Sequence, residues 1–320
     1  MKVVLFGSGG FGIPTLGRLR SLHGRIDLVR LVSRPDRPRG RGREVAPTPL
    51  RARAIELGVP CDAPETANDP AYLETLAALA PDLFVVVDYG EMLRKPLRAL
   101  PRIGVFNLHG SLLPRYRGAA PVARALLAGE ETTGVTLFRV DRELDAGPIV
   151  DVVEARIEPI ETAGELEARL SILAADLIER NLEAFRSGAF RETRQDDSLV
   201  TYAPRLEKSE GLIEWDADPP AIANRVRALN PWPTAWSFLR KEGRRPERTS
   251  FLRVRPVSSS ADSSLSPGSV EVVRRDGFSV RCRGGAVDVL ELKREGGTAL
   301  DAASYLRGRP LRLGDRFAAS

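Results

Sequence analysis

The chain has 320 residues, of which 42% are hydrophobic and 28% are charged, and its formal net charge is +5. This length accommodates two domains, and the composition is typical of a folded globular protein rather than a disordered or fibrous one. No stretch approaches the roughly 20 consecutive apolar residues that cross a bilayer, so we expect no membrane association. Neither the two cysteines nor the two histidines show metal-ligand spacing, which predicts a metal-free cytoplasmic protein.

The first half of the chain alternates strand and helix patterns. This alternation is typical of an α/β fold with a doubly wound, mostly parallel, Rossmann-like sheet, whose ligands bind at the carboxyl ends of the strands. Strands are predicted at residues 3–6, 28–32, 83–87, 104–108, 134–140 and 149–157, and helices at 11–22, 49–57, 70–79, 121–127 and 162–185.

The pattern changes after residue 188. A polar stretch at 191–202 indicates a linker, and a helix is predicted at 221–229 behind two prolines. Short alternating runs follow at 251–257, 269–274, 278–283 and 287–292, which favour a small OB-like β-barrel. We therefore predict three parts: a first domain at 1–188, a linker at 189–205 and a C-terminal barrel at 206–320.

A glycine-rich turn follows the first predicted strand. Gly7, Gly9 and Gly12 match the G-x-G-x-x-G pattern of dinucleotide-binding folds. The acidic residue expected about 20 positions later is missing, and Ser33 and Arg34 occupy that place. An arginine there could hold a 2′-phosphate, so a nicotinamide cofactor and a plain strand-to-helix turn both stay open.

A stronger motif lies at residues 106–118, which read FNLHGSLLPRYRG. It starts at the end of a buried strand, where Asn107 and His109 alternate onto the same side. Downstream, Asp145 lies in a tight turn between two predicted strands. Placed near His109, its carboxylate could orient the imidazole and stabilise the cationic form.

These three side chains suit the attack of an external amine on an activated carbonyl. Asn107 and His109 would donate hydrogen bonds to the developing oxyanion. Asp145 would hold His109 and help remove the proton that the amine loses, directly or through water. Ser111 lacks the G-x-S-x-G setting of a hydrolase nucleophile, so no covalent intermediate is required.

At these residues the chain resembles the formyltransferases that use 10-formyltetrahydrofolate. Their signature is Asn-x-His, then Ser-Leu-Leu-Pro-x-aromatic-Arg-Gly, then Leu-Asp-x-Gly. The basic stretch at 35–43, PDRPRGRGR, looks like the loop that members acting on methionyl initiator tRNA insert into its acceptor arm, and NPWP at 230–233 looks like the entry to their C-terminal barrel. The resemblance covers nearly the whole chain.

The resemblance implies a role for each matching position. The donor would be 10-formyltetrahydrofolate without a metal, the acceptor would be initiator methionyl-tRNA, and we expect a monomer. Catalytic residues would be Asn107, His109 and Asp145; folate contacts would be Ser111, Leu112, Leu113, Pro114, Val87, Asp88, Tyr89 and Gly90; tRNA contacts would be Arg37, Arg39, Arg41 and Arg43.

The chain departs from the family pattern in several places. Asp88 and Glu91 stand where small and apolar residues are usual, and Glu143 replaces a customary glycine. The alternatives are a formyltransferase for an amino sugar nucleotide, a hydrolase releasing formate from the same folate, a nicotinamide-dependent oxidoreductase and a non-catalytic RNA-binding protein.

Overall fold

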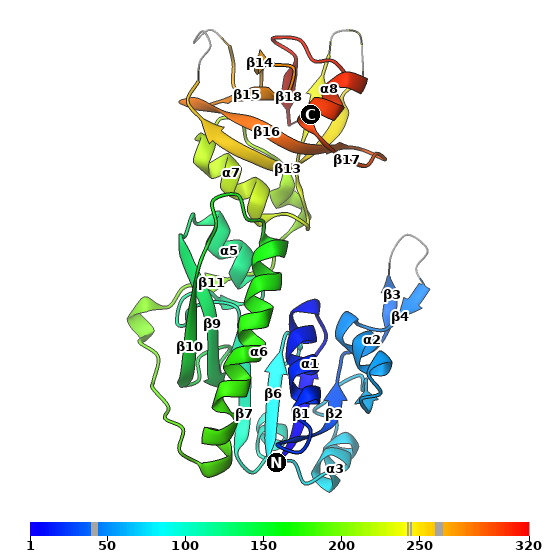
Figure 1. Ribbon diagram of the computed structural model, residues 1–320, viewed down its shortest axis with the longest axis vertical. Coiled ribbons are helices and arrows are strands. Elements are labelled where there is room, and N and C mark those ends of the chain that lie inside the picture. Colours follow the sequence, from blue (N-terminus) through cyan, green and yellow to red (C-terminus); the bar gives the residue numbers. More distant parts are fainter. Residues whose placement is uncertain (40–43, 242, 244, 260–264, 320) are drawn as a thin grey trace. The chain divides into compact units, whose positions relative to one another are not determined.

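The computed structural model describes residues 1–39, 44–241, 243, 245–259 and 265–319 (Figure 1). The chain forms two compact units. The first comprises Met1–Pro121, Thr132–Arg156 and Glu167–Pro204, and the second comprises Val122–Glu131, Ile157–Leu166 and Arg205–Ser320.

The first unit is built on a seven-stranded sheet with the order β10-β9-β7-β6-β1-β2-β5. The pairs from β5 through β7 are parallel, whereas β9 and β10 add antiparallel strands at one edge. The predicted doubly wound, mostly parallel sheet is confirmed. Its strands are β1 (Lys2–Gly7), β2 (Asp27–Val32), β5 (Cys61–Asp62), β6 (Leu83–Val87), β7 (Gly104–His109), β9 (Thr132–Arg139) and β10 (Ile149–Arg156).

Helices cover both faces of this sheet, since its central strands are apolar on both sides. In Figure 1, α1 and α6 lie side by side in front of the sheet, and Arg18 of α1 pairs with Asp176 of α6 at 2.7 Å. On the opposite face, Leu76 of α3 and Leu97 of α4 join one apolar cluster with the sheet. The helices are α1 (Ile13–Ser21), α2 (Pro49–Glu56), α3 (Pro70–Ala78), α4 (Lys95–Arg98) and α6 (Ala163–Ser187).

The helix starts follow from local sequence. Thr48 precedes α2 and its hydroxyl accepts a hydrogen bond from Arg51 N at 3.3 Å, while Asp69 caps α3 through the main-chain nitrogens of residues 71 and 72. Each cap is followed by proline at the first helical position, where the missing N–H has no helical partner to lose.

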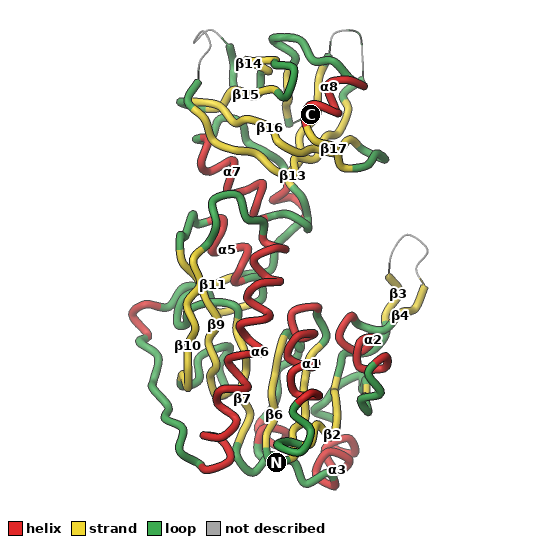
Figure 2. The backbone as a smooth tube through the Cα atoms, in the orientation of Figure 1, coloured by secondary structure: helices red, strands yellow, loops and turns green. Residues whose placement is uncertain are grey.

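The second unit carries an antiparallel sheet with the order β14-β15-β16-β13-β12-β18, and β17 pairs with β16. The ends of this order meet, because Val270 N donates to Asp315 O at 2.8 Å and a bridge joins Ser269 to Arg316. The sheet therefore curls into a barrel (Figure 2), as predicted. Its elements are α7 (Pro219–Ala228), β12 (Ala235–Arg240), β13 (Glu247–Val257), β14 (Val270–Val273), β15 (Phe278–Cys282), β16 (Gly285–Arg294), β17 (Ala299–Asp301), α8 (Ala302–Gly308) and β18 (Arg316–Ala318), with α5 (Pro121–Leu127) also in this unit.

Short elements complete the fold. β3 (Arg37–Arg39) and β4 (Glu44–Ala46) form a hairpin, and β8 (Arg117–Gly118) pairs with β11 (Tyr202–Ala203). Short 3₁₀ turns lie at Gly10–Gly12, Asp197–Leu199 and Lys208–Gly211. None of the described helices is long and apolar enough to cross a membrane.

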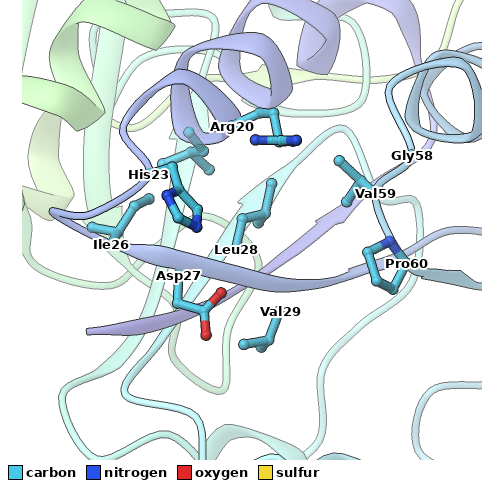
Figure 3. A pocket seen from close by; sticks show the side chains of 10 residues that line it. Arg20, His23, Ile26, Asp27, Leu28, Val29, Gly58, Val59 and Pro60 are labelled. Atoms are coloured by element: carbon cyan, nitrogen blue, oxygen red, sulfur yellow. The ribbon is translucent and has the colours of Figure 1, made fainter.

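A pocket of about 650 Å³ lies on the first unit between the end of α1, the start of β2 and residues 58–60 (Figure 3). Its polar lining comes from Arg20, His23 and Asp27. Asp27 begins β2, so this pocket lies at the amino ends of the parallel strands. Ligands of such sheets bind at the carboxyl ends, and we assign this pocket no part in the chemistry.

Candidate active site

Strand β7 directs Asn107 and His109 to one face of the sheet, as predicted from their alternation. Phe106 points the other way, where its ring lies 4.4 Å from that of Phe185 on α6. Val105 belongs to the apolar cluster on the opposite face, and residues 107 and 109 share its side because strand side chains alternate. The two polar side chains therefore lie on the face away from α6.

The buried ring of His109 is held by a backbone carbonyl. His109 is 6% exposed, and its Nε2 lies 2.8 Å from the carbonyl oxygen of Tyr116. A carbonyl oxygen can only accept, so Nε2 carries a hydrogen and donates it. The nitrogen left for a substrate is Nδ1.

Asp145 brings a carboxylate to that free nitrogen. It lies between β9 and β10, its side chain is 10% exposed, and its Oδ2 is 3.8 Å from His109 Nδ1. The same oxygen accepts a hydrogen bond from Gly118 N at 2.9 Å. At 3.8 Å the two side chains are too far apart for a hydrogen bond, but the carboxylate is close enough to interact with a charge on the imidazole. The structure thus brings the predicted His–Asp pair together.

Asn107 has bonding capacity left for a ligand. Its Oδ1 is buried and has no hydrogen-bond partner within the part of the chain that the structure describes. Buried polar atoms are nearly always bonded, so such an atom beside His109 indicates a place where a ligand's polar group binds.

Two hydroxyl groups, one from the loop and one from β9, hold the loop after β7 in place. Ser111 is fully buried, and its hydroxyl donates to Arg115 O at 2.7 Å. Thr136 on β9 donates to Ser111 O at 2.6 Å and accepts from Leu113 N at 3.0 Å. The Ser111 side chain is therefore engaged within the loop, while Leu112 and Pro114 keep partly exposed surface and Leu113 is buried.

The second predicted ligand segment, residues 87–90, follows β6. Val87 is fully buried, and the Tyr89 ring packs in the core 5.4 Å from the Phe6 ring. Asp88 and Gly90 are exposed, and both have positive φ angles, 48° and 80°. The surface that this segment offers a ligand thus comes from Asp88 and Gly90.

The Asp88 carboxylate lies directly over the glycine turn. A Cβ placed on Gly9 would be 1.6 Å from Asp88 Oδ2, so any larger residue there would require the exposed Asp88 side chain to move. A dinucleotide pyrophosphate at this turn would meet a negative charge at close range. This arrangement speaks against the nicotinamide-binding alternative.

Arg34, the other basis of that alternative, is paired with Glu91. Burial raises the pKa of Glu91, but hydrogen bonds from Thr66, Ala67 N and Asn68, together with Arg34, lower it below its ordinary value. The charged carboxylate thus links the loops after β2, β5 and β6, and the arginine that a 2′-phosphate would need is engaged.

The basic stretch at 35–43 is described only in part. Arg37 in β3 is largely exposed and lies 2.7 Å from Glu65. The side chain of Arg39, and Arg41 and Arg43 as a whole, lie outside the described residues. Among the described residues, no group of three or more His, Cys, Asp or Glu side chains is arranged to hold a metal ion.

Gly118 joins the active-site loop to β11 and has a testable requirement for glycine. Its φ is +129°, and a Cβ would lie 2.6 Å from Ala203 O. We expect Gly118→Ala to separate β8 from β11, to displace the N–H that binds Asp145, and to lower kcat at least about tenfold with a loss of about 1–3 kcal/mol in stability. Steady-state kinetics measure the loss in kcat, and thermal unfolding measures the loss in stability.

Gly17 provides the matched control. A Cβ there meets nothing within 4 Å, and the residue lies within α1. Gly17→Ala should keep full activity and raise the free energy of unfolding by about 1 kcal/mol. If Gly118→Ala and Gly17→Ala had the same kcat and the same stability, glycine at position 118 would not be required for the site.

Two residues that the sequence did not single out lie at the centre of the site's hydrogen bonding. Gln195 and Arg117 are both buried and bonded to each other at 2.7 Å and 3.1 Å. Arg117 lies within the motif at residues 106–118, so its place in the sequence could have pointed to a role in the site. Gln195 lies in a polar stretch without periodicity, and no pattern marks it.

Comparison with known proteins places the chain in a family. It matches the formyl transferase domain over residues 1–182 and the formyl transferase C-terminal domain over residues 205–310. It is 40% identical over 311 residues to the methionyl-tRNA formyltransferase of Xylella fastidiosa (strain 9a5c), covering 97% of this chain and 98% of that one. It is 38% identical over 308 residues to that of Geotalea uraniireducens (strain Rf4), covering 96% and 95%.

Solved structures share the fold. The sugar 3N-formyl transferase WlaRD, determined in the presence of dTDP and 5-N-formyl-THF, has a TM-score of 0.64 at 15% identity over 93% of this chain and 99% of that one. HypX from Aquifex aeolicus in complex with tetrahydrofolic acid has a TM-score of 0.61 at 17% identity over 100% of this chain and 50% of that one. The chain therefore belongs to the formyl transferase family and, within it, to the methionyl-tRNA formyltransferases.

Proposed function

We propose that this protein transfers the formyl group of 10-formyltetrahydrofolate to the α-amino group of methionyl initiator tRNA in the cytoplasm. The observation that carries the proposal is the buried group formed by Asn107, His109 and Asp145, in which one amide oxygen and one imidazole nitrogen are left for a ligand. The identity to methionyl-tRNA formyltransferases over nearly the whole chain supports the acceptor.

The proposed chemistry uses all three side chains. The amine attacks the formyl carbon, forming a C–N bond, and the carbonyl oxygen gains negative charge. Asn107, through its amide nitrogen, and the protonated Nδ1 of His109 donate to that oxygen, and the Asp145 carboxylate 3.8 Å from Nδ1 stabilises the imidazolium. The amine loses its proton to Asp145 or to a water molecule, the bond to the folate nitrogen breaks, and tetrahydrofolate leaves with that nitrogen protonated.

We place the folate along two segments, Ser111–Pro114 and Val87–Gly90. Ser111–Pro114 follows the end of β7, and Val87–Gly90 begins at the end of the neighbouring strand β6. Because the side chains of Ser111 and Tyr89 are engaged within the protein, their contacts would be made by main-chain atoms. Asp88, Gly90, Leu112 and Pro114 offer the exposed surface.

For the tRNA we propose the basic stretch with Arg37, Arg39, Arg41 and Arg43, together with residues 206–320. Residues 1–188 would then be the catalytic domain, joined to the tRNA-binding barrel through 189–205. A net charge of +5 favours a polyanionic substrate, whose binding weakens as salt rises.

Arg41→Ala is expected to raise KM for the tRNA on the order of tenfold with kcat and the folate KM nearly unchanged, because a phosphate contact positions the acceptor and takes no part in the chemistry. The salt dependence of tRNA binding should also become shallower, by about one unit of slope. Arg186, an exposed arginine near the end of α6, supplies the control Arg186→Ala. An unchanged tRNA KM in Arg41→Ala would remove the basic stretch from the proposal.

A panel of acceptors tests the function itself. The enzyme receives 10-formyltetrahydrofolate with charged initiator tRNA, uncharged tRNA, an amino sugar nucleotide or water alone, and formylated product and free formate are both measured. We expect formylmethionyl-tRNA from the charged tRNA only. A formylated sugar nucleotide would establish the first alternative, and formate without aminoacyl product would establish a hydrolase.

A further inference from the structure

The segment after α6 sends one glutamine into the active-site scaffold. Gln195 is 5% exposed although its sequence neighbours are exposed. Its Nε2 donates to the main-chain oxygens of Asp145 and Gly147, each at 2.8 Å. Its Oε1 accepts from Arg117 Nε at 3.1 Å and from Nη2 at 2.7 Å. Every donor and acceptor site of the amide is used.

The partners fix which end of the amide is which. Carbonyl oxygens only accept and a guanidinium only donates, so nitrogen must face the turn of Asp145 and oxygen must face Arg117. A carboxylate of the same size could keep the second contact but would repel the two carbonyls. This difference makes glutamine, and not glutamate, the residue that the site requires.

Through these bonds Gln195 connects the two loops that hold the reacting side chains. Arg117 directly follows Tyr116, whose carbonyl accepts the hydrogen bond from His109. The other two bonds hold the turn that presents Asp145. One side chain thus sets the position of the imidazole and of the carboxylate relative to each other.

The same segment supports the first loop through its main chain. Arg117 N donates to Thr201 O, and Tyr116 N donates to Thr201 Oγ1, both at 2.9 Å. Ala119 N donates to Ala203 O at 2.9 Å. The loop between His109 and Gly118 therefore rests on residues 201–203, a short distance along the chain from Gln195.

We propose that Gln195 is a positioning residue for formyl transfer, which holds Asp145 Oδ2 at 3.8 Å from His109 Nδ1. The expected effect on kcat rests on the proposed function. The expected effect on the positions of Asp145 and His109 rests on the hydrogen bonds alone. Without the amide, two buried carbonyls lose their donor and the Asp145 turn shifts. A charge pair that has moved by about 1 Å stabilises the transition state less, while the binding surfaces stay unchanged.

The test compares Gln195→Glu and Gln195→Ala with the control Thr193→Ala. Thr193 is exposed, and its two bonds to Ile149 are made by main-chain atoms. For both Gln195 variants we expect kcat to fall about 10- to 100-fold, with KM for folate and for tRNA changed less than twofold. Thr193→Ala should match the wild type.

A spectroscopic readout is available because the chain has only two histidines. With ¹⁵N-labelled histidine, the imidazole nitrogens of His109 should shift in both Gln195 variants, while those of His23 stay fixed and report an intact fold. If Gln195→Ala fails to fold, Gln195→Glu, which keeps the side-chain volume and the Arg117 contact, supplies the result.

Wild-type kcat in Gln195→Glu, or unchanged His109 signals in that variant, would overturn the inference. A rise in KM with kcat preserved would also overturn it, since the residue would then act in binding. If the wild-type enzyme formylates no acceptor, the proposed function fails, and the His109 signals still decide whether Gln195 sets the geometry of the site.

Discussion

Replacing His109 by alanine is expected to lower kcat on the order of 10³-fold. The substitution removes the Nδ1 donor that we propose for the carbonyl oxygen of the formyl group, and with it the positive charge that Asp145 would stabilise. KM for tRNA should change little, because the buried ring offers the acceptor little surface. Steady-state kinetics with both substrates measure the two effects separately.

The alanine variant also leaves the carbonyl of Tyr116 without its donor, which costs about 1–3 kcal/mol of stability. His109→Gln separates this structural loss from the chemical one, since a glutamine amide can donate to the same carbonyl but cannot carry a charge. Both variants should be equally slow, and the glutamine variant should unfold at the higher temperature. Near-normal turnover in His109→Gln would show that the imidazole is dispensable.

Replacing Asp145 by asparagine is expected to lower kcat about 10²- to 10³-fold. The amide keeps the size of the side chain and an oxygen that can accept from Gly118 N, so the charge alone is lost and the imidazolium is no longer stabilised. The φ of Asp145 is +50°, a region that asparagine adopts readily. Thermal unfolding should therefore be almost unchanged.

Asp145→Ala provides the comparison, because it removes the charge and adds backbone strain at this φ. It should be as slow as Asp145→Asn but less stable. If Asp145→Asn retained wild-type kcat, the carboxylate would have no electrostatic role in the reaction.

The sequence was sufficient to predict where the polar side chains of the candidate site lie because they belong to compact local patterns. A buried β-branched strand that ends in Asn107 and His109 determines the face on which both lie, through alternation alone. Asp145 lies in a turn that glycine and proline mark in the sequence. That the turn reaches His109 was an expectation from chemistry, and the 3.8 Å separation confirms it.

The supporting residues could not be predicted because their partners are remote main-chain atoms. Gln195 bonds to carbonyls 48 and 50 residues away. In an irregular polar stretch, no sequence pattern distinguishes the one residue that is buried from its exposed neighbours. Ser111 has a structural role that its place in the motif did not reveal, because its hydroxyl closes the loop by donating to Arg115 O. Its predicted folate contact stays a prediction.

The elements of the fold also fall into those that the sequence predicts and those that depend on remote contacts. Longer strands and helices were predicted because they bury several residues with a regular period. The two-residue strands β5, β8 and β11 have no period to read, and they form where neighbouring loops supply a partner. The barrel was predicted from four runs, and its closure through β18 depends on contacts between residues 269–270 and 315–316.

One departure from the family pattern has a structural reason. Glu91 pairs with Arg34 and accepts hydrogen bonds from Thr66 and Asn68, so its charge is neutralised by Arg34 and its side chain joins neighbouring loops. Burial, followed by the Glu91 carboxylate, raises the pKa of the Tyr89 hydroxyl, which stays protonated and donates to Glu91 at 3.4 Å. Nothing in the structure explains Glu143, which is exposed.

A double-mutant cycle on formyl transfer to charged initiator tRNA, with His109→Ala, Asp145→Asn and the two combined, shows whether His109 and Asp145 act as one unit. If the pair acts as one unit, the combined loss in the double variant should fall well short of the product of the two single losses, because the carboxylate no longer has an imidazolium to stabilise. If the two losses instead multiply, Asp145 and His109 act independently, and the proposal that the carboxylate works by stabilising the imidazolium is wrong.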